Sequence, residues 1–160
     1  MYHVANLSES ARREDDRVAP YECMSAVIAL AFSVEAMLNF VGKKKLGDQW
    51  NERARYGQKV QALEKRLNFK YTKTDEPYLT LETLKEARDH MAHGKPVELE
   101  IVANAKQDVV VAMRPAWTPA TDPTTVLAAA RRVSEFKEFL FKRARIKPGS
   151  EFSSYMAMPE

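Results

Sequence analysis

Residues 24–41 read MSAVIALAFSVEAMLNFV, an apolar run that decides the fold class. The run is long enough to cross a lipid bilayer. It contains Glu35 and Asn39, however, and a carboxylate in the middle of a membrane span is costly. We therefore interpret residues 21–41 as the buried central helix of a soluble helical bundle, without a membrane partner. The glycines and three lysines of residues 42–47 are expected to end this helix.

Helices are also predicted on both sides of the central helix. Residues 7–18 are typical of a short charged helix. Residues 48–67 indicate a surface helix, because apolar side chains recur there at spacings of three and four. Residues 79–93 predict a further helix that begins at Thr80 as N-cap and stops at Gly94. The buried stripe of the 48–67 helix would consist of Trp50, Ala54, Gly57, Val60, Leu63 and Leu67.

The hydrophobic period changes after the 79–93 helix. Residues 97–113, VELEIVANAKQDVVVAM, alternate apolar and polar positions and then become β-branched, which predicts a small β-hairpin. Asp122 and Pro123 begin a last helix that ends near Arg145. Residues 1–147 are thus expected to form one mainly α domain, an up-and-down four- or five-helix bundle with an inserted β-hairpin. Residues 148–160 would be a flexible tail.

Charge and cysteine content narrow the class of protein. The single cysteine, Cys23, excludes an intramolecular disulfide framework, and the N-terminal residues lack the pattern of a secretory signal, so we expect a cytoplasmic protein. Residues 43–73 contain ten basic residues and three acidic ones. Such asymmetry favours a polyanion such as RNA as partner, although basic residues also line ordinary solvated helix faces. The candidate RNA-binding residues are Lys43, Lys44, Lys45, Arg53 and Arg55.

An arginine occupies the apolar face of the 79–93 helix. At about 100° per residue, Arg88 shares a face with Leu81, Leu84 and Met91. A buried arginine is expensive unless it is paired, because arginine keeps its proton. Glu35 is the one acid of the central helix after Glu22, so we predict a Glu35–Arg88 pair that Asn39 helps to satisfy.

Histidines follow at the end of the same helix. His93 lies in the last turn, and Asp89 one turn before it is expected to hydrogen-bond its ring, as in general acid–base sites. His90 lies between them as a supporting residue. A metal site of Glu86, His90 and His93 is the weaker reading, because neither a cysteine pair nor an H-E-x-x-H motif accompanies these residues. We predict neither a metal nor another cofactor.

The segment ARDHMAHG, residues 87–94, resembles the signature motif of HEPN domains, which is an arginine, a polar residue, three further residues and a histidine. Arg88, Asp89 and His93 match its positions, and the central helix with its acid resembles the core helix of the family. The predicted hairpin departs from the family pattern. The resemblance implies a helical bundle that forms homodimers, in which two Arg–His motifs line one cleft.

Many HEPN domains are metal-independent ribonucleases, several of them toxins or antiviral effectors. The resemblance therefore implies an endoribonuclease in which His93 is the acid or base, Arg88 binds phosphate and Asp89 orients. An antitoxin or another regulatory protein would be a further partner. One alternative is a non-catalytic HEPN-like module for dimerisation or for binding a nucleotide or partner protein, in which Glu35–Arg88 is a structural pair. The other is a nucleic-acid-binding helical protein that does not dimerise.

Overall fold

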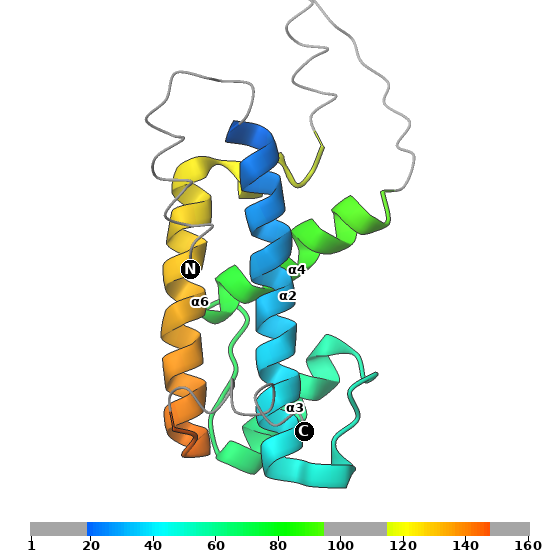
Figure 1. The fold of residues 1–160 in the computed structure, drawn as a ribbon, viewed down its shortest axis with the longest axis vertical. Coiled ribbons are helices and arrows are strands. Elements are labelled where there is room, and N and C mark those ends of the chain that lie inside the picture. The colour runs from blue at the N-terminus through cyan, green and yellow to red at the C-terminus, as the bar shows by residue number, and fades with distance from the viewer. Residues whose placement is uncertain (1–18, 95–114, 148–160) are drawn as a thin grey trace, which may run out of the picture. The chain divides into compact units, whose positions relative to one another are not determined.

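The computed structural model of the chain describes residues 19–94 and 115–147. These residues form four α-helices, α2 (Ala19–Leu46), α3 (Tyr56–Leu67), α4 (Tyr78–Ala92) and α6 (Pro123–Ala144) (Figure 1). Two short 3-10 helices accompany them, η1 (Gly47–Gln49) and η2 (Thr118–Thr121), and the described part of the chain contains no strand. The prediction of a mainly α protein is confirmed. The predicted helix at 7–18, hairpin at 97–113 and tail at 148–160 lie outside the described residues.

The chain divides into two compact units. The described part of the first unit comprises residues 19–31, 82–94 and 115–130, and that of the second comprises residues 32–81 and 131–147. The helices α2, α4 and α6 each contribute residues to both units, so the division does not separate the chain into consecutive segments.

The helix α2 is longer than predicted, because it continues through Gly42 and the three lysines to Leu46. Gly42 is not a stop signal but a place of close packing. A Cβ atom at this position would overlap the indole ring of Trp50, which covers the helix there. The helix ends instead at Gly47, whose φ of +56° is a left-handed conformation that suits glycine.

The start of α3 was also predicted wrongly. The helix begins at Tyr56 rather than at residue 48, and residues 50–55 form a loop between η1 and α3. Trp50 is buried, 7% exposed, but it reaches the core from this loop. Its spacing from Val60 and Leu63 matched a helical stripe by coincidence. Val60 and Leu63 are buried as predicted.

The helix α4 was predicted to within a residue at each end, but its N-cap was not. Thr80 is the third residue of α4, and its hydroxyl donates to Oε2 of Glu76 at 2.7 Å. The start of α6 is confirmed, since Oδ1 of Asp122 accepts hydrogen bonds from the backbone N–H groups of Thr124 and Thr125 at 3.0 and 3.1 Å. Its end is confirmed as well, with Arg145 in a left-handed conformation just beyond Ala144.

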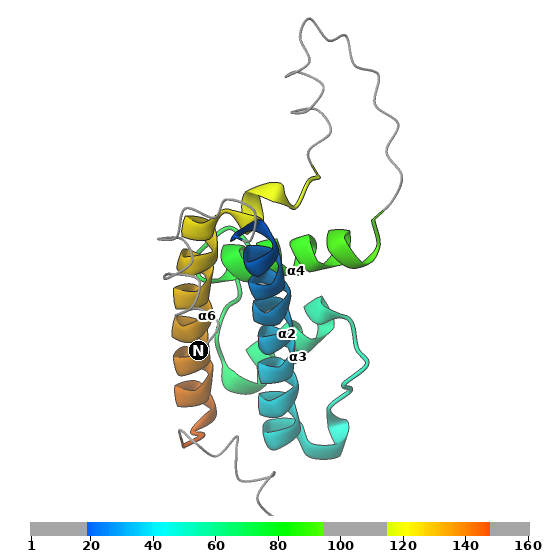
Figure 2. The ribbon, with the colours of Figure 1, turned by 45° about the horizontal axis from the view of Figure 1, so that its top comes forward.

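Each unit has its own apolar core. In the second unit the C-terminal halves of α2 and α6 run side by side, and the rings of Phe40 and Phe141 lie 5.8 Å apart between them (Figures 1 and 2). Tyr78 of α4 packs on Phe136 of α6, with ring centroids 6.0 Å apart. The buried residues of the first unit come from α2, α4, η2 and α6, and they are Cys23, Ala26, Val27, Ala31, Leu84, Ala87, Ala120, Val126 and Ala129.

Among the described residues, one helix, α2, is long and apolar enough to cross a membrane. An 18-residue window of it reaches a mean hydropathy of 1.8, and 39% of that window is buried within the protein. Length and composition of this kind occur in the core helices of soluble proteins as well as in membrane spans.

Candidate functional site

The C-terminal part of α4 holds a cluster of paired charges in the first unit. Oδ1 of Asp89 accepts hydrogen bonds from Nε and NH2 of Arg88 at 3.1 and 2.8 Å. Oδ2 of Asp89 accepts one from Nζ of Lys85 at 2.8 Å, one helical turn earlier. The Arg88 side chain is 21% exposed, which agrees with its predicted place on the apolar face. The carboxylate therefore fixes the orientation of the guanidinium.

Asp89 itself has a perturbed acidity. Partial burial raises its pKa, but the hydrogen bonds and charges of Lys85 and Arg88 outweigh that effect and hold the pKa below the ordinary value. Asp89 is thus ionised throughout the neutral range, and it remains a fixed negative partner of both cations.

His93 lies one residue beyond the end of α4 and is exposed. Its backbone N–H still donates to the carbonyl oxygen of Asp89 at 2.9 Å, so the last helical turn is closed. Its ring, however, is not held by Asp89 as expected. Both carboxylate oxygens of Asp89 are already used by Lys85 and Arg88. Asp89 therefore positions Arg88, and the imidazole of His93 is left open to solvent.

The other residues of the weaker metal reading are scattered. His90 and Glu86 are both exposed on α4. Within residues 19–94 and 115–147, no three His, Cys, Asp or Glu side chains gather as they would around a metal ion. Within the part of the chain that the structure describes, no hydrogen bond or ion pair joins His90 to Arg88 or His93.

Glu35 belongs to the second unit, where it meets a lysine that sequence reasoning placed on a solvated face. Oε1 of Glu35 accepts a hydrogen bond from Nζ of Lys59 at 2.8 Å, and the Lys59 side chain is 1% exposed. A buried ammonium needs such a partner, because removing it from water costs several kcal/mol. The predicted pairing of Glu35 with Arg88 would connect the two units, and it stays a prediction.

Asn39 lies one helical turn after Glu35, and the predicted bond between its amide and that carboxylate stays a prediction. Its Oδ1 is buried and accepts no hydrogen bond from the described residues. The indole Nε1 of Trp50 is likewise buried and has no acceptor there. An unsatisfied buried group of this kind costs about 1–3 kcal/mol. Both atoms lie in the second unit, as does the Glu35–Lys59 pair.

The candidate RNA-binding residues all lie in the second unit. Lys43, Lys44 and Lys45 form the last turn of α2, and Nζ of Lys43 contacts Oδ1 of Asp48 at 3.1 Å. Arg53 and Arg55 are exposed in the loop before α3. These five residues lie at the two ends of one short segment, residues 43–55, which comprises the end of α2, η1 and the loop before α3.

Two residues of these clusters were missed by sequence reasoning, and both had a signal. Lys59 lies one helical turn before Leu63, so the helical wheel places it on the buried stripe of α3. Lys85 lies one turn before Asp89, the spacing of a helical ion pair.

Comparison of the chain with protein-family models, with curated proteins and with solved structures finds no match.

Proposed function

We propose that the chain is a metal-independent endoribonuclease of the HEPN type, with Arg88 and His93 as its catalytic residues. The observation that carries the proposal is the arrangement at the end of α4. There a carboxylate holds the Arg88 guanidinium, and an exposed imidazole follows one turn later. An imidazole can transfer protons and a guanidinium can stabilise the phosphate charge, so together they can support RNA cleavage without a metal.

The chemistry uses the nucleophile that RNA itself carries. The 2′-hydroxyl attacks the adjacent phosphorus, and an imidazole accepts its proton while the bond to the 5′-oxygen breaks. An imidazolium returns a proton to that oxygen, which leaves as a 5′-hydroxyl beside a 2′,3′-cyclic phosphate. The guanidinium of Arg88 stabilises the additional negative charge on the phosphate in the transition state. Asp89 acts as a positioning residue for Arg88.

One helix supplies a single Arg–His pair, so we further propose a homodimer in which two copies of the motif share one cleft. The bundle would be of the up-and-down kind, and the protein would be cytoplasmic. The basic residues at 43–45, Arg53 and Arg55 would bind the RNA backbone beside the cleavage site. A toxin or antiviral role, with an antitoxin or other regulatory protein as partner, follows from the same resemblance.

The direct test is cleavage of a labelled RNA in the presence of EDTA. We expect the wild-type protein to produce 2′,3′-cyclic phosphate ends, and His93→Ala and Arg88→Ala to reduce the rate at least about 100-fold. His90→Ala is the matched control, because it removes an exposed histidine of the same helix, and it should retain the wild-type rate. Equal rates for the wild type and His93→Ala would contradict the proposal that the protein is a ribonuclease.

The alternative is a non-catalytic HEPN-like module in which Arg88 has only a structural role. The extensive burial of Arg88 favours it, since its side chain is 21% exposed. In that case Arg88→Ala lowers the melting temperature strongly, while the wild-type protein leaves RNA intact. An inactive Arg88→Ala variant that melts near the wild-type temperature, beside an active wild type, excludes the alternative.

A further inference from the structure

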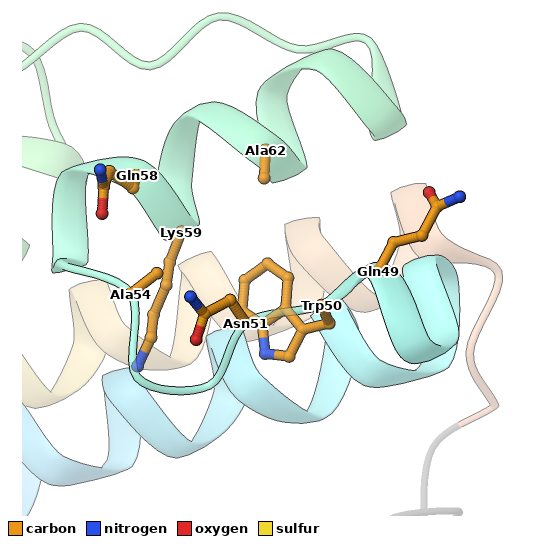
Figure 3. A pocket seen from close by; sticks show the side chains of 7 residues that line it. All are labelled: Gln49, Trp50, Asn51, Ala54, Gln58, Lys59 and Ala62. Carbon is orange, nitrogen blue, oxygen red and sulfur yellow. The ribbon is translucent and has the colours of Figure 1, made fainter.

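A pocket opens beside α3 in the second unit, apart from the motif of α4. Its free volume is about 250 Å³, and its walls come from the loop after η1 and from the first half of α3 (Figure 3). This is slightly below the range of about 300–1,000 Å³ that drug-sized ligands occupy, so one flat ring system is a fitting occupant. The lining residues are Gln49, Trp50, Asn51, Ala54, Gln58, Lys59 and Ala62.

Two side-chain amides of this pocket are oriented by the backbone. Oδ1 of Asn51 accepts a hydrogen bond from the N–H of Arg53 at 3.0 Å. Oε1 of Gln58 accepts one from the N–H of Arg55 at 3.1 Å. Each bond fixes which end of the amide is the oxygen, and neither NH₂ group has an acceptor among the described residues. The pocket is therefore lined by two amides whose NH₂ groups are available as donors.

The remaining walls are apolar or already neutralised. Ala54, Ala62 and the Trp50 ring supply apolar surface (Figure 3). The ammonium of Lys59 is bonded to Glu35, so it does not offer an unpaired charge to a bound anion. The N–H of Trp50 lacks an acceptor in the described part of the chain, but it is buried and does not face a ligand in the pocket. A ligand with carbonyl oxygens and apolar faces matches this combination better than a free phosphate does.

The basic residues around the pocket indicate which class of molecule would carry such a ring. Arg53 and Arg55 are exposed on the loop that forms its edge, and Lys43, Lys44 and Lys45 precede η1. Cations along a strand of RNA engage its phosphates, while unpaired bases enter pockets that read their edges. We propose that this pocket binds one unpaired, carbonyl-bearing base of the RNA, such as uracil. The proposal rests on RNA being the substrate.

The test uses Trp50 as its own reporter. The chain has two tryptophans, so Trp117→Phe in the full-length protein leaves Trp50 as the single indole. Uridine 5′-monophosphate is then titrated while the emission of Trp50 is recorded, with ribose 5-phosphate as a probe that has the phosphate but lacks the base. We expect a saturable change with the nucleotide and none with ribose 5-phosphate. Equal responses to both probes, or no response to either, would overturn the base pocket.

Two matched variants of the Trp117→Phe protein test whether the side-chain amide of Gln58 binds the nucleotide. Gln58→Glu keeps an oxygen for the Arg55 N–H but replaces the donor NH₂ by a second acceptor. Gln61→Glu introduces the same charge on an exposed residue of α3 outside the pocket. We expect Gln58→Glu to weaken nucleotide binding at least about 10-fold and Gln61→Glu to change it less than about 2-fold. Similar weakening in both variants would refute the assignment.

Cleavage assays separate this inference from the proposed function. His93→Ala should abolish RNA cleavage and leave nucleotide binding at Trp50 unchanged. If RNA is cleaved but the nucleotide does not bind, the base pocket alone is wrong. If the nucleotide binds with the expected Gln58→Glu effect but the wild type cleaves no RNA, the ribonuclease alone is wrong.

Discussion

The Lys59 ammonium is buried in the second unit and depends on Glu35 for its negative partner. Removing the acid leaves this ammonium without its carboxylate, whereas removing the lysine leaves an acid that is 37% exposed and can be hydrated. We expect Glu35→Ala to lower the free energy of unfolding by about 2 kcal/mol. This loss is smaller than that for a fully buried ion pair, because Glu35 is partly exposed to water. Lys59→Met should cost less than about 1 kcal/mol. Urea denaturation measures both, and a larger loss for Lys59→Met contradicts the explanation.

Asp89 links the stability of the first unit to pH. Its pKa in the folded state is depressed by Lys85 and Arg88, against the effect of burial, so protonation favours the unfolded chain. Its contribution is complete above the ordinary carboxyl pKa of 3.8 and is lost as the pH falls below about 4 through the folded-state value. Asp89→Asn should therefore flatten the decline of stability with acid. Melting temperatures measured between neutral pH and about pH 3 test this, and parallel curves for both proteins would contradict it.

At the residue scale, the sequence predicted where Arg88 lies but not that Asp89 would bind its guanidinium. Hydrophobic periodicity places a residue on a helix face, and the 21% exposure of Arg88 follows from that. The choice of partner depends on which side-chain atoms come within hydrogen-bonding distance. Asp89 bonds two cations on its own helix, Lys85 and Arg88, whereas His93 lies beyond the end of α4 and is exposed.

Gly42 shows at the scale of an element how a helix can require a glycine. Gly→Ala in a helix ordinarily stabilises by about 0.4–1 kcal/mol. At Gly42, however, the new methyl would overlap the Trp50 ring, and overpacking of this kind costs about 1–3 kcal/mol. We expect Gly42→Ala to destabilise by that amount in urea denaturation. Gly57→Ala in α3 is the control, because its methyl meets no atom within 4 Å, and it should be neutral or stabilising.

Asp122 is the second element-scale determinant, since it caps α6 through the N–H groups of Thr124 and Thr125. Loss of an N-cap of this kind costs about 1 kcal/mol. Asp122→Ala should reduce the free energy of unfolding by that amount, whereas Asp122→Asn, which keeps an oxygen acceptor, should lose clearly less. Thermal or urea denaturation distinguishes the two, and equal losses would show that the cap is unimportant.

The ends of the helices separate what sequence can predict from what it cannot. Asp122 and Pro123 act within the first turn of α6 itself, so the start of α6 was predicted correctly. The end of α2 and the start of α3 depend instead on the packing of the Trp50 ring, which lies in the loop at residues 50–55, against Gly42. A local sequence pattern does not reveal such a contact. The end of α2 and the start of α3 were therefore misplaced together.

The whole molecule is mainly α as predicted, and its arrangement beyond that is the least accessible to sequence. The helix α2 is apolar over much of its length, so its pattern does not specify which neighbour covers which side. Amphipathic helices such as α6 fix one buried face, and Val126, Val133, Phe136 and Leu140 are buried on it.

The proposed homodimer has a consequence that mixing experiments can measure. If Arg88 of one chain and His93 of another act on the same phosphate, an Arg88→Ala protein mixed with a His93→Ala protein forms dimers that regain one intact set. We expect cleavage to reappear in the mixture after subunit exchange, although each variant alone is inactive. Light scattering verifies the dimer. A mixture that exchanges subunits and stays inactive would place both residues of a working site on one chain.

The burial of Lys59 against Glu35 also bears on how this chain can change over evolutionary time. Glu35 alone is a poor starting point for substitution while Lys59 is kept, since its loss leaves a buried cation. In descendants of this sequence, position 59 should therefore change before position 35 or together with it. In a library randomised at both positions and selected for folding, an acid at 35 should be enriched wherever lysine is kept at 59.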